Sequence, residues 1–133
     1  LRAFDGVVPY RLEMQARLVC DGFKNLYAFW NNLLYDELTK DDGEILNLAS
    51  KEYSKAVEPY IKEGVRFVTC VFGNYVKGKL KVKATEAKMA RGEMVRLCAE
   101  NNVQSVDEVK AYNVRGYVFN EELSTETEFV FVK

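Results

Sequence analysis

Hydrophobic and polar residues alternate strictly in the segment PYRLEMQARL, residues 9–18. A period of two is the period of a β-strand, so the pattern predicts a strand that buries one face. The opposite face carries charged and amide side chains, namely Arg11, Glu13, Gln15 and Arg17. This face either lines a binding cleft or is simply solvated, and the alternation leaves both interpretations open.

Apolar residues recur at helical spacing in two longer segments. Residues 23–40 show this spacing and predict a core helix with Asp21 as its N-cap. The same period over residues 86–101 predicts a second helix. Ser105 and Glu108 have the spacing of a capping box, which predicts that a short helix begins at this point of the sequence.

The rest of the chain is predicted to form strands, turns and one further helix. Residues 44–49 indicate a short buried strand, and a helix is expected from Lys51 to about Pro59. Residues 65–84 are typical of a β-hairpin, and GYVFN and EFVFV predict two closing strands. We therefore expect a single α+β domain over residues 1–133, with a mixed or antiparallel sheet, a hairpin and packed helices.

Composition fits a globular domain and removes several classes of function. The 133 residues are 48% hydrophobic and 13% aromatic, which is ample for a core. Histidine is absent, and its absence excludes Ser-His-Asp and Cys-His nucleophiles and histidine metal sites. Cys20, Cys70 and Cys98 are widely spaced in apolar surroundings, so we expect reduced, mostly buried thiols.

The location of the protein is also constrained by the sequence. No apolar run approaches the ~20 residues that span a bilayer, and no signal-peptide pattern opens the sequence. We therefore expect a soluble cytoplasmic protein without a membrane partner. The opening LRAFDG lacks an initiator Met, which favours a fragment whose natural start lies upstream.

Basic residues are concentrated in one segment. Nineteen basic and twenty acidic residues give a formal charge of −1, but residues 77–96 hold seven basic residues against Glu86 and Glu93. Lys79, Lys81 and Lys83 lie at a period of two and are expected to share one strand face, which suits phosphate contacts along a nucleic-acid backbone. Lysines on an edge strand also discourage aggregation, and that interpretation stays open.

The helix after these lysines has a basic face with a glycine at its centre. On a helical wheel Lys88, Arg91, Gly92 and Arg96 lie opposite the apolar residues. A glycine inside a helix costs ~1 kcal/mol relative to alanine. Either another backbone packs closely against Gly92, or a ligand such as a phosphate approaches it.

The exit of the predicted strand at residues 44–49 is a second candidate for anion binding. Asn47 and Ser50 lie there, before the helix that begins at Lys51. Backbone N–H groups at a helix start attract anions, although a serine at this position often only caps its own helix.

Several blocks of the sequence resemble those of a known family. The blocks are LRAFDGVVPYRLEM, LYAFWNNLL, LNLASKEYSKAV, AKMARGEMVR, and GYVFNEELS followed by EFVF. They are similar, in the same order, to blocks of the YaaA family, peroxide-stress proteins also catalogued as UPF0246. Family members are longer, so the chain resembles the C-terminal portion and is expected to pack against a missing N-terminal portion.

The resemblance implies a cytoplasmic protein of the peroxide and oxidative-stress response. It further implies binding of DNA, duplex or locally unpaired, through a basic cleft, and an indirect effect on iron homeostasis that limits iron-driven damage. The family's basic block falls on KMARG, within the basic helix face. By the same resemblance, cleft candidates are Arg11, Glu13, Asn47, Ser50 and Tyr53.

Two functional hypotheses follow. In the first, the chain binds nucleic acid and its basic residues contact phosphates, while Tyr75 or Tyr117 stacks on bases. The predicted phosphate contacts are Lys79, Lys81, Lys83, Lys88, Arg91 and Arg96. In the second, the chain is an enzyme acting on a nucleotide or nucleic acid, with Glu13, Glu52 or Glu121 as the acid or base. We expect no cofactor, and no metal site is indicated, because only scattered carboxylates are available as ligands.

Overall fold

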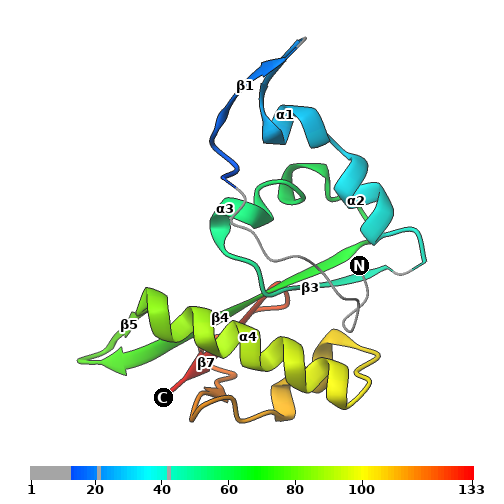
Figure 1. Cartoon of the computed structure of the whole chain (residues 1–133). Helices are drawn as coiled ribbons and strands as arrows, with labels where there is room; N and C mark the ends of the chain where they lie inside the picture. Colours follow the sequence, from blue (N-terminus) through cyan, green and yellow to red (C-terminus); the bar gives the residue numbers. More distant parts are fainter. Residues whose placement is uncertain (1–12, 21, 42) are drawn as a thin grey trace.

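A computed structural model describes residues 13–20, 22–41 and 43–133. Its centre is a mixed sheet in the order β3-β4-β7-β6, in which β3 and β7 run parallel to β4 and β6 runs antiparallel to β7. A short strand, β5, pairs antiparallel with the end of β4. The strands are β3 (Glu44–Asn47), β4 (Arg66–Val76), β5 (Lys79–Lys81), β6 (Val118–Phe119) and β7 (Glu128–Val132). The predicted α+β fold with a mixed sheet and a hairpin is confirmed (Figure 1).

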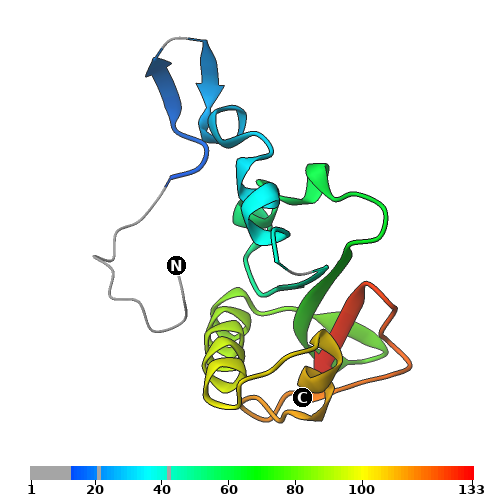
Figure 2. The same cartoon turned by 90° about the vertical axis from the view of Figure 1, so that its right-hand side faces the viewer.

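One face of the sheet is covered by a long helix, α4 (Ala84–Glu100). Its apolar side buries Ala87, Ala90 and Met94 against the sheet, as the helical wheel predicted. On the sheet side, Phe72 and Phe131 stack with ring centroids 5.1 Å apart. This packing holds α4 against the sheet, and Figure 2 shows the helix to one side of β4 and β7. Lys88 and Arg96 on the opposite side of the helix are exposed.

The predicted capping box is present. The Ser105 side chain and the Glu108 carboxylate both accept bonds from backbone N–H groups, at the start of the 3₁₀ helix η2 (Val106–Ala111). Val106 and Val109 from this helix complete the core. No helix in the described part of the chain is long and apolar enough to cross a membrane.

The strand predicted for residues 9–18 is only partly present. Residues 9–12 and Arg11 lie outside the described residues, and Met14 and Gln15 form a turn rather than a strand. The strand β1 (Arg17–Cys20) begins later and pairs antiparallel with β2 (Phe23–Asn25). Alternation predicted the right element type here but placed it too early along the chain.

The single helix predicted for residues 23–40 is wrong. Asn25 caps a short helix, α1 (Leu26–Trp30), by accepting a hydrogen bond from the Ala28 N–H. The chain then turns through Asn31, whose φ is 47°, before α2 (Leu33–Leu38) begins. The expected N-cap Asp21 lies outside the described residues, and β2 occupies residues 23–25 instead.

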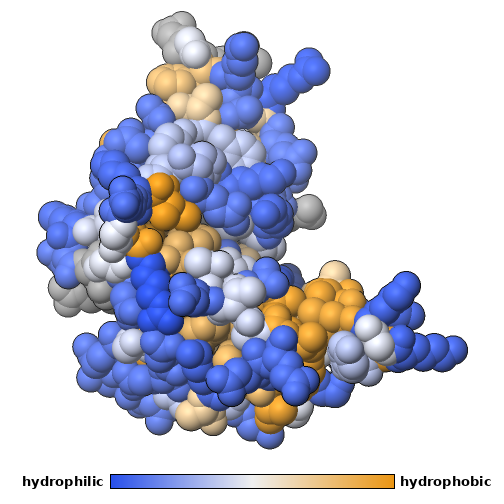
Figure 3. Space-filling view, turned by 180° about the vertical axis from the view of Figure 1, so that it is seen from behind, coloured by the Kyte–Doolittle hydropathy of each residue, from blue (hydrophilic) through white to orange (hydrophobic). Residues whose placement is uncertain are grey.

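These two helices bury little of their apolar surface. Tyr35 is the only residue of α1 and α2 that is buried, whereas Leu33 and Leu38 are 58% and 52% exposed. The expectation of a core helix is therefore not met in this chain. Seen from behind, apolar side chains interrupt the hydrophilic surface of the molecule (Figure 3).

The helix predicted from Lys51 begins there but is much shorter. The helix α3 (Lys51–Ser54) makes about one turn, and a separate 3₁₀ helix, η1 (Glu58–Tyr60), follows. Pro59 lies within η1 rather than at the end of one continuous helix.

Candidate nucleic-acid interface

The hairpin of β4 and β5 carries lysines at its tip and along its second strand. Val76 and Lys79 pair across a two-residue turn, in which Lys77 and Gly78 have φ of 52° and 75°. Such positive angles are typical of the tight turns that match strand twist. Lys79 and Lys81 are exposed at alternate positions of β5, so they share one face. Hydrophilic side chains project from this end of the molecule, at the right of Figure 3.

Lys83 does not belong to this strand, contrary to the prediction. β5 ends at Lys81, and Lys83 is the N-cap residue of α4. Its ammonium lies 3.2 Å from the Glu86 carboxylate. This hydrogen bond is the largest of the contacts that lower the pKa of Glu86, so the carboxylate stays ionised and holds Lys83 in place.

Lys133 is a basic residue of this surface that sequence reasoning missed. Parallel pairing of β7 with β4 brings the end of β7 beside the hairpin, where the Lys133 N–H donates to the Gly73 carbonyl at 3.3 Å. Its ammonium lies 3.5 Å from the Glu86 carboxylate. We call the following lysines the hairpin basic surface: Lys77, Lys79, Lys81, Lys83, Lys88 and Lys133.

The basic side of α4 is divided between free and paired side chains. Lys88 is exposed and forms no ion pair with any described residue. Arg96 instead contacts Glu93 at 2.6 Å and Glu100 at 3.8 Å on its own helix. The paired Arg96 is less available to a phosphate than Lys88, because its charge is already partly neutralised.

Gly92 lies between them with open space around it. A Cβ added at Gly92 would meet no heavy atom within 4 Å. Close packing of another backbone therefore does not explain this glycine within the part of the chain that the structure describes. Approach by a ligand, or by another part of a longer protein, remains a prediction.

Arg91, at the border of this basic side, lines a polar cleft beside α4. The cleft has a volume of about 290 Å³ and lies between α3, α4 and the middle of β4. Its floor is the middle of β4. On this edge, β4 has finished pairing with β3, where Asn47 pairs with Thr69, and has not yet begun to pair with β5, where Asn74 pairs with Lys81. Its polar lining includes Asn47, Lys51, Ser54, Glu58, Arg91 and Glu128.

The polar groups of this cleft are largely engaged with one another. The Asn47 side chain donates to Thr69 Oγ1 at 3.0 Å and accepts from the Ala49 N–H at 3.1 Å. Glu58 accepts a hydrogen bond from Ser54 at 2.6 Å and lies 3.6 Å from the Lys51 ammonium. Asn47 therefore joins the two parallel strands, and Arg91 is the cation of the cleft without an ion pair among the described residues.

The other cleft candidates are scattered. Ser50 precedes α3 but makes no side-chain capping bond, and a helix of four residues has too small a dipole for the predicted anion site. Tyr53 is 40% exposed and lines a separate apolar hollow. Arg11 lies outside the described residues, and Glu13 is exposed on the turn before β1.

The carboxylates proposed for catalysis do not line the polar cleft. Burial, followed by the charges of Glu52 and Glu13, raises the pKa of Tyr27, so these two carboxylates lie near that ring. Glu121 instead lines a hollow beside Arg66 and Lys110. The carboxylates of the polar cleft are Glu58 and Glu128, which sequence reasoning did not select.

The two tyrosines proposed for base stacking differ sharply. Tyr75 is 53% exposed near the hairpin tip, where a base can reach it. Tyr117 is 1% exposed and packs edge-on against Phe72, so it cannot stack on a base. The prediction for Tyr117 is wrong because its strand-like sequence pattern does not show which face is buried.

The described thiols are poorly suited to reaction with peroxide. Burial raises the pKa of Cys70 to about 12 and also raises the pKa of Cys98. The thiolate is the reactive form, so both side chains are weak nucleophiles near neutral pH. Among the described residues, no group of three or more Cys, Asp or Glu side chains is placed to hold a metal ion.

The sequence of this chain matches a known protein family. A family model described as "Peroxide stress protein YaaA" matches residues 1–123. The chain belongs to the YaaA family. The match covers the hairpin, the basic side of α4 and the polar cleft, all of which lie before residue 123 except Glu128 and Lys133.

Individual relatives extend the same result. A UPF0246 protein of Limosilactobacillus reuteri is 51% identical over 131 residues, which are 98% of this chain and 53% of that protein. A UPF0246 protein of Desulfitobacterium hafniense is 50% identical over 133 residues, which are 100% of this chain and 53% of that protein. One from Clostridioides difficile is 43% identical over the whole chain and 54% of its own length. The chain thus spans about half the length of these relatives.

Proposed function

We propose that this chain supplies a phosphate-binding surface with which a peroxide-stress protein of the YaaA family binds DNA in the cytoplasm. The observation that carries the proposal is the hairpin basic surface, six lysines of which Lys83 and Lys133 pair with Glu86. Exposed lysines in such an arrangement attract a phosphate backbone and release its counterions.

The polar cleft and Gly92 extend this surface. Arg91 offers a planar guanidinium, which suits phosphate recognition, and the open space at Gly92 lets a backbone come close to α4. Tyr75 is placed to stack on an unpaired base beside the hairpin. Together these features favour duplex DNA with a locally unpaired segment as the partner.

The role in peroxide stress is then protection of DNA rather than chemistry on peroxide. The raised pKa values of Cys70 and Cys98 argue against a thiol peroxidase activity of these residues. An effect on iron levels would be indirect in this proposal and would belong to the complete protein.

The proposal is tested by the salt dependence of binding. Fluorescence anisotropy of this chain with a labelled duplex, with and without an unpaired bubble, gives log Kd against log salt concentration. Six phosphate contacts predict a slope of magnitude about 5, and each contacting lysine removed lowers it by about one.

The variants can be matched for charge. The double variant Lys79→Ala/Lys88→Ala is expected to lower the slope by about two units. The control Lys24→Ala/Lys55→Ala removes two exposed lysines outside the hairpin basic surface and should leave the slope unchanged. Equal slopes for both double variants, or no binding by the unmodified chain, would contradict the proposal.

A further inference from the structure

The strand β3 lies at the edge of the sheet and has an open side. Its only neighbour among the described strands is β4. The Arg66 N–H donates to the Gly43 carbonyl at 2.8 Å, so alternate residues from Gly43 onward direct their backbone groups toward β4. The N–H and C=O of Leu46 therefore point away from β4, and no described residue hydrogen-bonds them.

The described residues of this edge strand include no lysine, no proline and no bulge. Natural edges carry lysines, prolines or bulges that discourage pairing with another strand. The residues of β3 are EILN, and their register with β4 is continuous from Glu44 with Arg66 to Asn47 with Thr69. The one charged side chain, Glu44, contacts Arg66 at 3.1 Å within the sheet. The strand has the sequence character of an interior strand.

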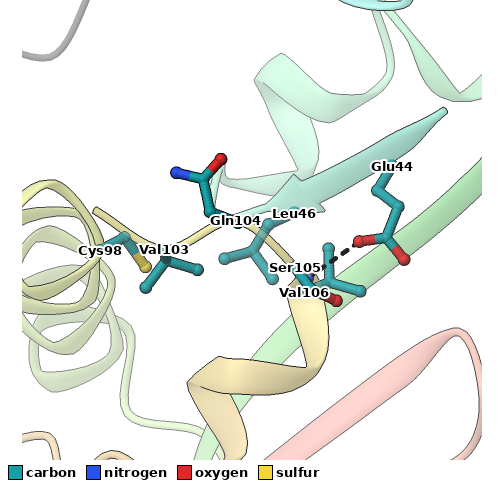
Figure 4. A pocket seen from close by; sticks show the side chains of 7 residues that line it. All are labelled: Glu44, Leu46, Cys98, Val103, Gln104, Ser105 and Val106. Carbon is teal, nitrogen blue, oxygen red and sulfur yellow. Dashed lines mark hydrogen bonds between the residues drawn. The ribbon is translucent and has the colours of Figure 1, made fainter. Parts of the chain in front are cut away.

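Hollows flank the open edge on the side of α4. A mixed hollow of about 190 Å³ has the apolar lining residues Leu46, Cys98, Val103 and Val106 and the polar ones Glu44, Gln104 and Ser105, and in Figure 4 these side chains lie between α4, β3 and the start of η2. A second hollow of about 420 Å³ shares Leu46, Cys98 and Val103 and continues to Leu48 and Val95. Val95 is 49% exposed although it borders this apolar surface.

A third hollow lies on the side of α2 and α3. It has a volume of about 200 Å³, and its lining includes Leu38, Ile45, Leu48 and Phe67. Strands of parallel sheets are normally covered on both faces. Among the described residues, β3 has apolar hollows on both faces and a partner strand on one edge only, which points to a further neighbour.

We propose that the part of the family chain that this sequence does not contain adds a strand to β3 at Leu46 and fills the flanking hollows. The chain spans 53% of the Limosilactobacillus reuteri relative, so a comparable length of polypeptide is available to supply the strand and its covering segments. A second copy of this chain fits less well. It offers only the four residues of β3 for pairing, whereas a stable interface uses about 20 to 30 residues a side.

Hydrogen exchange provides the direct test. The Leu46 amide is expected to exchange quickly in this chain alone, because it has no described hydrogen-bond partner. In the complete Limosilactobacillus reuteri protein, the amide aligned with Leu46 should exchange at least about 100-fold more slowly. The Val68 amide, on the central strand β4, should be protected in both proteins and serves as the internal control.

A pair of substitutions on α4 tests the hollows independently. Val95→Glu and Met89→Glu alter residues that are 49% and 48% exposed, but only Val95 borders a hollow beside β3. In this chain alone, both variants should melt within about 2 °C of the unmodified chain. In the complete relative, a glutamate at the position aligned with Val95 should lower Tm by about 5 °C or more, and one aligned with Met89 should not.

Three results would overturn the inference, and none of them depends on DNA binding. The first is slow exchange of Leu46 in the monomeric chain alone, which would mean that the chain covers its own edge. The second is protection of Leu46 together with a dimer in light scattering, which would identify a second copy as the neighbour. The third is equally fast exchange at this position in the complete relative.

Discussion

At the scale of single residues, Arg66 joins the sheet to η2. Its guanidinium lies 3.1 Å from Glu44 and 2.5 Å from Asp107. The Val106 N–H, followed by Arg66, lowers the pKa of Glu44, and the hydrogen bond from Arg66 holds the pKa of Asp107 well below its usual range. These charges fix the ends of β3 and η2 and serve the fold rather than the basic surface.

This arrangement predicts acid-sensitive stability. Both carboxylates have a folded-state pKa below the unfolded value, so they stabilise the fold above about pH 4.5, and the contribution is lost as pH falls through the lowered folded-state values. Arg66→Ala should therefore reduce the free energy of unfolding more at pH 7 than at pH 2, where part of the contribution is already lost. Urea denaturation at several pH values measures this difference, with Lys55→Ala as a control. A loss of stability that is the same at pH 7 and pH 2 would contradict the electrostatic explanation.

At the scale of elements, helical periodicity predicted the helix correctly where a single apolar face of that helix packs against the sheet. α4 was predicted over residues 86–101 and observed as Ala84–Glu100, because Ala87, Ala90 and Met94 form one continuous buried stripe. The same periodicity failed over residues 23–40. There Asn31 adopts a positive φ and divides the segment, and the apolar side chains have little described surface on which to pack.

The candidate site was predictable only where it is local in sequence. Lys79, Lys81 and Lys88 follow one another along a hairpin and a helix, so spacing alone placed them on the surface. Lys133 and Lys51 join the site through parallel pairing of β7 and β3 with β4. Apolar patterns show that strands exist, but they do not show the order of strands in a sheet.

Gly92 provides a prediction at the same scale. Gly92→Ala should raise the free energy of unfolding by about 1 kcal/mol, because the position is helical, exposed and sterically open. The same change should weaken DNA binding if a phosphate backbone approaches the glycine. Thermal denaturation and anisotropy measure the two effects separately. A more stable variant with unchanged affinity would show that DNA does not approach Gly92.

At the scale of the whole molecule, charge and apolar surface are separated. The chain has a formal charge of −1, yet the hairpin basic surface gathers six lysines at one end of the sheet. β1 and β2 lie at the opposite end of the molecule (Figures 1 and 2). Between the two ends, the open edge of β3 has apolar hollows on both faces. We infer that one surface is directed to DNA and the other to the remainder of the family chain.

The DNA-binding proposal is tested most directly by lysine acetylation read by mass spectrometry, with and without duplex DNA at low salt. DNA should slow modification of Lys77, Lys79, Lys81 and Lys88 by several fold, while the exposed Lys24, Lys40 and Lys55 react as before. Uniform protection of all lysines, or protection confined to the second group, would contradict a phosphate-binding surface on the hairpin.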